Sequence, residues 1–227
     1  MREVGRDALR QVADGVDHVR AIVVIVGCGQ FARGAEIDIL FQHFFGVAAQ
    51  GVPNYFGAQR FGFDGGNVEQ GRAMLAREIR VRNPKKKGIY LSAVRSFVFN
   101  EVLALRIQQG RWGQVLPGDV MDESGRPTGP LWGRGRVSTT DEAQALELGV
   151  AARHATLCDG MEHAGLDQER RALVARPVDL SWAWPQADQL VLTFVLPAGN
   201  YATSVLSEIL RTTEPDRHTE NEPVAIE

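Results

Sequence analysis

The spacing of apolar residues predicts one long helix near the middle of the chain. In YLSAVRSFVFNEVLALRIQQG, residues 90–110, apolar side chains recur at intervals of three and four, the spacing of one helical face. Ser92 is a suitable residue to begin this helix and Gly110 to end it. The apolar stripe consists of Val94, Phe97, Val98, Val102 and Leu105.

Similar spacing predicts helices elsewhere in the chain. In residues 64–80, Asn67 is the expected N-cap, and Ile79 is expected to face inward with Val68, Met74 and Leu75. The other predicted helices are residues 7–21, 35–50, 140–165 and 202–211.

Three stretches have the composition or alternation of β-strands. They are AIVVIV at 21–26, VDLSWAW at 178–184 and QLVLTFVL at 189–196. Only PQAD separates the last two, so they are predicted to form a hairpin. Helices and strands together indicate an α+β fold. After Arg211 the polar tail is expected to be disordered.

The bulk composition is that of a globular protein, with 44% hydrophobic and 23% charged residues. The apolar runs are shorter than the roughly 20 residues that a membrane helix needs, so we expect a cytosolic protein that does not enter a membrane. Cys28 and Cys158 are too few for a disulfide framework or a zinc cluster, and we expect both to be buried. The five histidines lack metal-ligand spacing, so no metal site is expected.

The net charge of −3 conceals an uneven distribution. Residues 52–111 contain eleven Lys and Arg but only four Asp and Glu, and the three lysines of the chain are adjacent in NPKKKG. The Pro and Gly of NPKKKG favour a loop. This asymmetry is typical either of a face for a phosphate backbone or of an ordinary solvated charge run.

Two glycine-rich stretches combine aromatic residues with arginine. They are GVPNYFGAQRFG at 51–62 and TGPLWGRGR at 128–136. RNA-binding proteins stack bases on aromatic side chains and hold phosphates with arginine. The alternative is that the aromatic residues Tyr55, Phe56, Phe61 and Trp132 belong to the core. Asp64, between these stretches and next to glycines, fits a turn or helix start better than a catalytic carboxylate.

A third glycine motif, GCGQFA at 27–32, fits the G-x-G-x-x-[GA] pattern of dinucleotide-binding folds. That pattern requires an acidic residue about 20 positions further on, and residues 39–63 contain neither Asp nor Glu. A dinucleotide-binding fragment is therefore the weakest of the functions that the sequence suggests.

GVPNYFGAQRFG closely resembles a characteristic segment of the TruD family of tRNA pseudouridine synthases. Three further stretches agree in the same order: YLSAVRSFVFNEVLALR (90–106), TGPLWGRG (128–135), and DLSWAW (179–184) followed by LPAGNYATSVLSEIL (196–210). The resemblance covers about residues 51–212.

This resemblance implies an enzyme that isomerises uridine 13 of tRNA to pseudouridine without a metal or organic cofactor. It further implies a family-specific inserted α/β domain at 51–176 and a hairpin and helix of the catalytic domain at 177–212. Residues 1–50 remain an unmatched N-terminal segment and 213–227 a disordered tail. The family's active-site aromatic matches Tyr201, which is expected to lie against the flipped target base.

The chain departs from the family where the chemistry should begin. The nucleophilic aspartate of the family lies in a G-x-K-D-x-x-A-x-T segment that the sequence lacks, so we expect the chain to be truncated and inactive alone. Ser207 also stands where the family usually has Arg. The leading alternative is a non-catalytic RNA-binding module, and the residues expected to contact RNA are Arg60, Lys85, Lys86, Lys87 and Arg95. We further expect AIVVIV to pair with the 178–196 hairpin.

Overall fold

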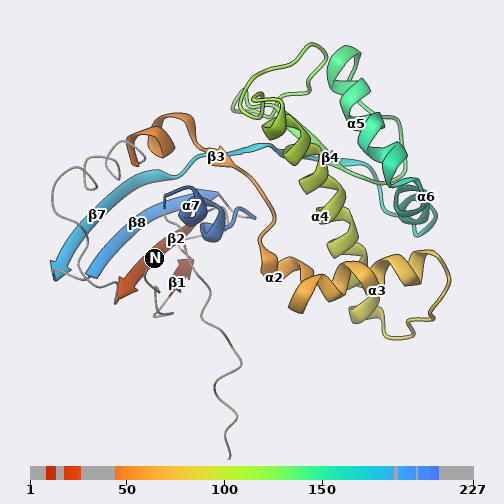
Figure 1. The fold of residues 1–227 in the computed structure, drawn as a ribbon, viewed down its shortest axis with the longest axis horizontal. Coiled ribbons are helices and arrows are strands. Elements are labelled where there is room, and N and C mark those ends of the chain that lie inside the picture. Colours follow the sequence, from red (N-terminus) through yellow and green to blue (C-terminus); the bar gives the residue numbers. More distant parts are fainter. Residues whose placement is uncertain (1–8, 14–17, 27–43, 187–188, 198, 210–227) are drawn as a thin grey trace, which may run out of the picture. The chain divides into compact units, whose positions relative to one another are not determined.

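The computed structural model describes residues 9–13, 18–26, 44–186, 189–197 and 199–209 (Figure 1). The chain divides into two compact units. Residues 1–49 together with 176–227 form one, here called the flanking unit, and residues 50–175 form the other, the central unit. Both contain helix and sheet, as the sequence predicts.

The flanking unit contains a four-stranded antiparallel sheet in the order β1-β2-β8-β7. Its strands are β1 (Leu9–Ala13), β2 (His18–Val26), β7 (Val178–Gln186) and β8 (Gln189–Pro197). The predicted 178–196 hairpin is confirmed, and so is the pairing of AIVVIV with it, because β2 runs alongside β8 over its whole length (Figure 1).

The helix predicted at 7–21 is wrong. β1 occupies the first part of this stretch and pairs antiparallel with β2, which begins at His18. Local spacing favours a helix here, but pairing with an existing strand edge satisfies the same backbone groups and outweighs a weak local propensity.

β8 has one buried face. Leu190, Leu192 and Phe194 have no exposed surface, whereas the alternating Val191, Thr193 and Val195 are partly exposed. Trp182 of β7 lies opposite Leu192, and the ring of Phe44 stacks on Trp182 with centroids 4.8 Å apart. Phe44 opens a helical stretch at residues 44–50, which agrees with the end of the helix predicted at 35–50; residues 35–43 lie outside the described residues.

β7 is the last strand of this sheet on its side and is irregular. Asp179 adopts a positive φ of 53° where the register with β8 shifts, and Pro185 lies near the end of the strand. A bulge and a proline both reduce the ability of an edge strand to pair with another chain. After β8, helix α7 (Ala202–Ile209) confirms the predicted last helix and buries Ala202, Val205 and Leu206.

The central unit is organised around helix α4 (Pro84–Gln108), which contacts α2, α3, β4, α5 and α6 (Figure 1). The predicted apolar stripe is largely correct, because Val94, Val98 and Val102 are almost fully buried. They form the main core cluster with Trp132, Val150, Ala151, Leu157, Cys158 and Met161. The remaining elements are β3 (Val52–Pro53), α2 (Ala58–Phe61), the turn η1 (Phe63–Gly65), α3 (Gly66–Leu75), β4 (Thr128–Leu131), α5 (Asp141–Arg153), α6 (Ala155–His163), β5 (Glu169–Ala172) and β6 (Val174–Ala175).

α4 begins earlier than predicted. Its N-cap is Asn83, whose side chain accepts hydrogen bonds from the backbone N–H groups of Lys85 and Lys86, and Pro84 is its first residue. The expectations that Ser92 caps this helix and that NPKKKG is a loop are therefore wrong. Asparagine followed by proline is a strong helix start, because the amide side chain caps and the proline needs no hydrogen-bond partner for its nitrogen.

The length and composition of α4 alone would allow it to cross a membrane. In this protein, however, α4 is the central helix of a packed unit, and two of its polar side chains are bonded within that unit. Arg106 pairs with Asp119, and Asn100 bonds the backbone of Phe56. The core of a globular domain is therefore sufficient to explain its apolar character.

α3 is shorter than predicted and has a different start. Its N-cap is Gly65 in a left-handed conformation, and Asn67 lies inside the helix, where its side chain donates to the carbonyl oxygen of Arg60. The helix ends at Leu75, so Ile79 lies beyond it and is 36% exposed. Gly71 allows α3 to approach α4 closely, because a Cβ there would lie 2.5 Å from Val94.

The helix predicted at 140–165 is two helices. α5 ends at Arg153 and α6 begins at Ala155, with His154 outside helical geometry between them. The imidazole of His154 lies edge-on to Phe97, with centroids 5.1 Å apart, and its Nε2 lies 3.3 Å from Glu101. The contacts of His154 with α4 stabilise the break between α5 and α6. The apolar spacing of residues 140–165 does not reveal this break.

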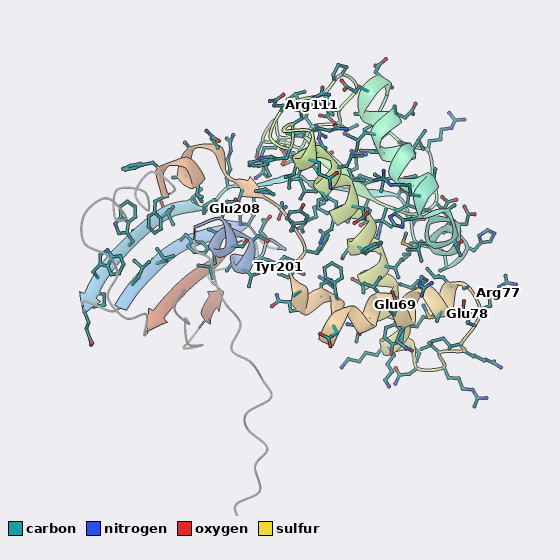
Figure 2. The ribbon with its side chains drawn as sticks, viewed as in Figure 1. Glu69, Arg77, Glu78, Arg111, Tyr201 and Glu208 are labelled. Atoms are coloured by element: carbon teal, nitrogen blue, oxygen red, sulfur yellow. The ribbon has the colours of Figure 1, made fainter. Side chains whose placement is uncertain are left out.

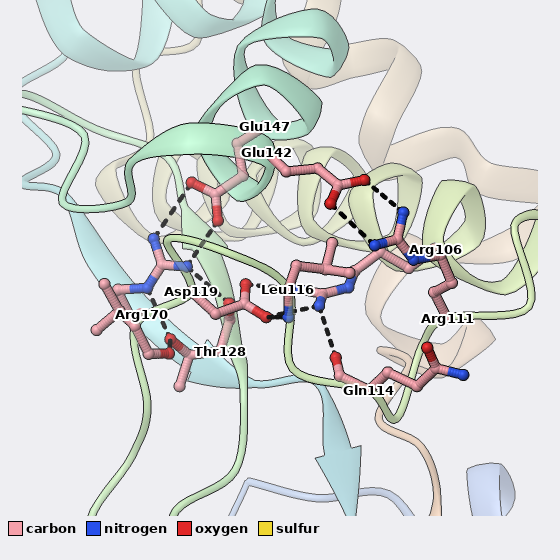
Figure 3. Close-up of polar contacts among 10 residues, drawn as sticks. Arg106, Arg111, Gln114, Leu116, Asp119, Thr128, Glu142, Glu147 and Arg170 are labelled. Carbon is pink, nitrogen blue, oxygen red and sulfur yellow. Dashed lines mark hydrogen bonds and ion pairs between the residues drawn. The ribbon is translucent and has the colours of Figure 1, made fainter.

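Buried polar contacts join the elements around α4 (Figure 3). Arg106 donates to both carboxylate oxygens of Asp119, which also accepts the backbone N–H of Leu116. Arg170 of β5 donates to Glu147 of α5 and to the backbone of Thr128. These contacts attach the 111–120 loop and α5 to the central helix and sheet.

Candidate nucleic-acid interface

The segment GVPNYFGAQRFG is anchored in the central unit by its asparagine. Val52 and Pro53 form β3, paired antiparallel with β6. Asn54 is 2% exposed; its side-chain amide donates to the carbonyl oxygen of Ala172, and its Oδ1 accepts from Arg171 at 2.6 Å. The segment thus consists of a short strand, a fixed bend and the single turn of α2.

Phe56, two residues later, is held along α4. Its backbone N–H donates to Oδ1 of Asn100, and the amide of Asn100 donates back to the carbonyl oxygen of Phe56. Its ring packs edge-on against Phe99, with centroids 5.5 Å apart. The alternative in which this aromatic residue belongs to the core is therefore correct for Phe56.

Trp132 of the second glycine-rich stretch is also a core residue. It is 6% exposed, and its indole N–H donates to Glu162. Tyr55 and Phe61 are half-buried. Phe56 and Trp132, the two most buried aromatic residues of the glycine-rich stretches, therefore support the surrounding backbone. Their rings are not exposed for stacking on bases.

Two arginines approach the ring of Phe56. The guanidinium carbon of Arg60 lies 5.5 Å from the ring centroid, and that of Arg171 lies 4.1 Å from it. Arg60, on α2, also donates to the hydroxyl of Ser92 at 2.9 Å. The sequence identifies Arg60 as a candidate, but it gives no local signal for Arg171, which reaches this place only because β5 pairs with β4.

The three lysines lie in the first turns of α4, at the end of a strongly basic stretch. We call residues 77–87 the basic segment; it contains Arg77, Arg80 and Arg82 before the lysines, and Glu78 is its one acidic residue. All of its charged side chains are exposed. Figure 2 shows Arg77 and Glu78 in the connection that follows α3.

This placement has an electrostatic cost. The N-terminus of a helix carries a partial positive charge and is stabilised by acidic residues, yet the first turn of α4 contains none. Lys85, Lys86 and Lys87 therefore add positive charge at a terminus that is already positive. Such an arrangement is suited to attracting an anion such as a phosphate.

Arg95 lies in a different environment from the other candidate RNA contacts. It donates to the carbonyl oxygens of Leu131 and Asp167 and pairs with Glu169 at 3.4 Å. Burial lowers the pKa of its guanidinium, although Glu169 and Asp167 partly oppose this effect. Arg95 thus joins α4 to β4 and β5, and any contact between it and RNA stays a prediction.

Tyr201 belongs to the flanking unit, at the start of α7 (Figure 2). The carbonyl oxygen of Tyr201 accepts the backbone N–H of Ser204, and the side chain of the preceding Asn200 donates to the carbonyl oxygen of Pro197. These bonds fix the turn from β8 into the helix. Ser207 of α7 donates to the carbonyl oxygen of Ser204.

The remaining candidates from the sequence are a metal site, the two cysteines, GCGQFA and Asp64. Within the described residues, no group of three or more His, Cys, Asp or Glu could hold a metal ion. Cys158 is buried, as predicted, and burial, with smaller contributions from Glu162 and Asp159, raises the pKa of its thiol to about 12. GCGQFA and Cys28 lie outside the described residues. Asp64 has a positive φ of 48° in the turn before α3, which agrees with its predicted role in a turn.

No family model matches the chain. The chain does match curated relatives. The chain is 39% identical over 211 residues to tRNA pseudouridine synthase D of Aeromonas salmonicida, with 83% of this chain and 59% of the relative covered. It is 42% identical over 201 residues to the protein of the same name from Ectopseudomonas mendocina, with 79% and 57% covered. The chain thus spans less than two thirds of the length of these relatives.

The share of this chain that the relative covers shows how far the similarity extends along the sequence. A coverage of 83% of 227 residues is about 188 residues, more than the 162 residues between 51 and 212. The similarity therefore extends beyond the stretch in which the motifs were found.

A solved structure agrees in fold. The crystal structure of a protein described as a putative tRNA pseudouridine synthase D from Methanosarcina mazei matches with a TM-score of 0.60 and 17% identity. The match covers 86% of this chain and 69% of that one. With the motifs in their expected order and about 40% identity to the curated relatives, the chain belongs to the tRNA pseudouridine synthase D family.

Proposed function

We propose that this protein binds tRNA, as a member of its family. We further propose that the site it retains is part of the site at which its relatives convert a uridine to pseudouridine. The 39% identity over 211 residues to a protein named for that reaction is the observation that carries this proposal. The target we infer is uridine 13 of tRNA, from the resemblance of the motifs to the TruD family. The reaction is an isomerisation, so it consumes no second substrate and needs no redox cofactor.

The two units correspond, in this proposal, to two parts of the family's architecture. The central unit, residues 50–175, is the family-specific inserted domain predicted at 51–176, and residues 177–212 are the last hairpin and helix of the catalytic domain. The four-stranded sheet of the flanking unit supports this assignment. β8 is an inner strand of this sheet and β7 is its edge strand, and the hairpin that they form leads directly into α7.

Tyr201 is the residue we assign to the target base. Pseudouridine formation requires the nucleotide to leave its stack, so that the glycosidic bond can break and the base can turn. An aromatic ring next to the flipped uracil compensates for part of the lost stacking. The backbone bonds around Tyr201 fix the turn that presents this ring.

The chemical step itself needs an aspartate nucleophile, and the 227 residues contain no G-x-K-D segment. Without the nucleophile the covalent intermediate cannot form, and contacts to the base do not replace it. We therefore propose that these 227 residues alone bind tRNA without isomerising it.

The basic segment is the surface we assign to the tRNA backbone. Six positive charges and one negative charge lie within eleven residues, and all are exposed. Backbone contacts of this kind position the RNA and supply affinity but carry no sequence information. Lys85, Lys86 and Lys87 are thus expected to affect the binding of every tRNA to a similar degree.

A direct experiment is to mix the purified 227-residue chain with unmodified tRNA transcript and measure both binding and pseudouridine formation. We expect binding that weakens steeply as salt rises, and no pseudouridine at position 13. Formation of more product than enzyme would overturn the proposed inactivity. Binding without salt dependence would contradict the role of the basic segment.

The second candidate function is a non-catalytic RNA-binding module whose target is not a tRNA. The exposed basic segment favours it, because charge alone does not select among RNAs. Competition between unmodified tRNA and an unrelated structured RNA of equal length separates the two. Preference for tRNA supports the family substrate, and equal affinity supports the general module.

A further inference from the structure

Arg77, the first residue of the basic segment, has a backbone conformation that residues with a side chain rarely adopt. Its φ is 62°, in the left-handed region. The other non-glycine residues with a positive φ in the described part of the chain are all aspartates: Asp64, Asp141 and Asp179. The short polar side chain of Asp can bond the nearby backbone and so tolerates this region, whereas the long side chain of arginine has no such compensation. The conformation of Arg77 is therefore the most costly of the four.

This strain follows from the way in which α3 ends. The backbone N–H of Arg77 donates to the carbonyl oxygen of Met74 at 3.2 Å, and that of Glu78 donates to the carbonyl oxygen of Ala73 at 2.9 Å. The two bonds form a Schellman motif, in which the residue at the position of Arg77 is left-handed and is usually glycine. Glycine adopts this conformation without steric cost. The end of α3 thus favours glycine at a position where the chain has arginine.

The side chain of Arg77 faces solvent. It is exposed and points away from the ribbon in the connection after α3 (Figure 2). In the part of the chain that the structure describes, it takes part in no hydrogen bond or ion pair. The nearby carboxylates act on a different arginine, because Glu69 bonds Arg72 at 2.7 Å and raises its pKa, with a smaller contribution from the charge of Glu78. Contacts within the described protein therefore do not explain an arginine at position 77.

The dipole of α3 is the remaining explanation within the fold. A cation near the C-terminus of a helix is stabilised by the partial negative charge there. Arg72 already places a positive charge in the last turn of α3. For an exposed side chain the dipole effect does not exceed the cost of the left-handed conformation in a residue other than glycine. The dipole alone therefore does not favour arginine over glycine.

Arg77 also differs from the lysines at the other end of the basic segment. Lys85, Lys86 and Lys87 lie at the N-terminus of α4, whose partial positive charge itself attracts anions. Arg77 follows the C-terminus of α3, whose partial charge repels anions, so at this end the arginine side chain must supply the attraction. Its planar fork binds two oxygens of one phosphate, and the bonded turn below it limits the entropy lost when it does so.

We propose that Arg77 is a fixed contact for a phosphate of the bound tRNA, at the α3 end of the basic segment. This inference rests on the proposed function for the identity of the ligand as tRNA. It goes beyond the general attraction assigned to the basic segment, because it names one residue whose backbone is held in place by the Schellman motif. The stability lost through the left-handed conformation is offset by a positive charge at one defined point on the surface.

The test uses the whole chain, unmodified tRNA transcript and three variants at this position. Arg77→Gln removes the charge and keeps the strain, Arg77→Gly removes both, and Arg77→Lys keeps both. Arg153→Gln is the matched control, because it removes an exposed arginine from the last turn of α5, where the backbone is helical. Dissociation constants are measured over a range of salt concentrations, and the melting temperature of each variant is recorded.

If Arg77 holds a phosphate, Arg77→Gln and Arg77→Gly each weaken tRNA binding about ten-fold, the effect expected for a lost charge-assisted hydrogen bond. Both variants reduce the slope of log affinity against log salt by about one, and Arg77→Lys keeps the slope because it keeps the charge. Arg77→Gly melts about 2–4 °C above Arg77→Gln, because only glycine relieves the strain. Arg153→Gln leaves affinity and slope unchanged.

Wild-type affinity and slope in Arg77→Gln and Arg77→Gly would overturn the contact and leave Arg77 a role at the helix end alone. An equal loss in Arg153→Gln would overturn it in favour of an effect of overall charge. Equal melting temperatures of the Gly and Gln variants would overturn the strain on which the assignment depends. In all three cases salt-dependent tRNA binding by the wild-type chain would leave the proposed function standing. A wild-type chain that does not bind tRNA would overturn the function and the contact together.

Discussion

The guanidinium of Arg106 and the carboxylate of Asp119 form a two-pronged ion pair, with N–O distances of 2.7 and 2.9 Å, while their side chains are only 2% and 0% exposed. The pair joins the C-terminal part of α4 to the 111–120 loop. The loop also needs Gly118, because a Cβ there would lie 1.9 Å from the carbonyl oxygen of Thr140. The loop and the start of α5 are therefore packed against each other closely.

Removing one partner of this pair should destabilise the central unit strongly. Asp119→Ala leaves the Arg106 charge buried without its carboxylate, and the expected loss is about 3–5 kcal/mol in the free energy of unfolding. Urea denaturation of the wild type and the variant measures it. Arg111→Gln at the exposed pair with Glu142 is the control, and its expected loss is much smaller, because water and salt screen an exposed pair. Equal losses at the two pairs would contradict the assignment.

The lysines of the basic segment should lower stability while supporting RNA binding. Replacing Lys85, Lys86 and Lys87 by Gln removes positive charge from the N-terminus of α4, which should stabilise the fold by about 0.3–1 kcal/mol per charge at low salt. The same variant should bind tRNA more weakly and with a smaller salt slope. Melting temperature and binding, measured at two salt concentrations, test both effects. A variant that melts at a lower temperature would contradict the electrostatic argument.

Asp122 should contribute stability that is lost in acid. Burial alone would raise the pKa of this carboxyl, but hydrogen bonds from the side chain and backbone of Arg126, its charge, and the N–H of Ser124 outweigh it and hold the pKa below its ordinary value. The contribution is therefore present above the unfolded pKa, about 3.9, and disappears as pH falls through the lower folded pKa. Asp122→Asn should be less stable than wild type at pH 7, and the difference should shrink toward pH 2. A constant difference across that range would count against this origin.

Cys158 should be unreactive in the folded protein. Its thiol, with a pKa of about 12, stays protonated, so a disulfide reagent at pH 8 finds little thiolate and little access. In a Cys28→Ser background, labelling should be slow until urea unfolds the chain. Because the raised pKa disfavours the folded state once the unfolded thiol ionises, stability should fall between about pH 8.5 and pH 12, and Cys158→Ala should remove that part of the decline.

β2 should be protected by its pairing with β8. Within the described residues, Val24 to Val26 pair with β8 and have no partner in β1, so their amides test the β2–β8 pairing. Slow hydrogen exchange is expected for the amides there that point to β8, and Thr193→Pro in β8, which removes a ladder donor, should accelerate it. Exchange at the rate of an unstructured peptide in the wild type would contradict the sheet order.

The elements predicted correctly are those in which the local pattern and the tertiary environment agree. The stripe at Val94, Val98 and Val102 and the alternation at 189–196 each face a core, so their periods are visible in the sequence. The start of α4 is an exception, because its signal is local: Asn83 and Pro84 form a cap and a first residue, although the same proline and the nearby Gly88 also fit a loop.

Other features depend on contacts that no local pattern contains. Residues 9–13 have helical spacing but become a strand because β2 offers them a partner. The break at His154 depends on Phe97 and Glu101 of another helix. Arg171 differs from its neighbour Arg170 only in which side of β5 it occupies: one reaches Phe56 and the other Glu147. Motifs identified the family, whereas the partners of each charged residue required the fold.

The pairing of β3 with β6 places the two ends of the central unit side by side. Val52 lies opposite Ala175 and Pro53 opposite Val174, and residues opposed in such a ladder have Cα atoms about 4.5–5.5 Å apart. A linker of a few residues could therefore replace the whole of 52–175 without stretching the chain that remains. By the same geometry, residues 50–175 could be transplanted into a surface loop of an unrelated protein, carrying the basic segment with them. The 126 residues of the central unit, 50–175, thus form a domain that could be moved as one piece between proteins.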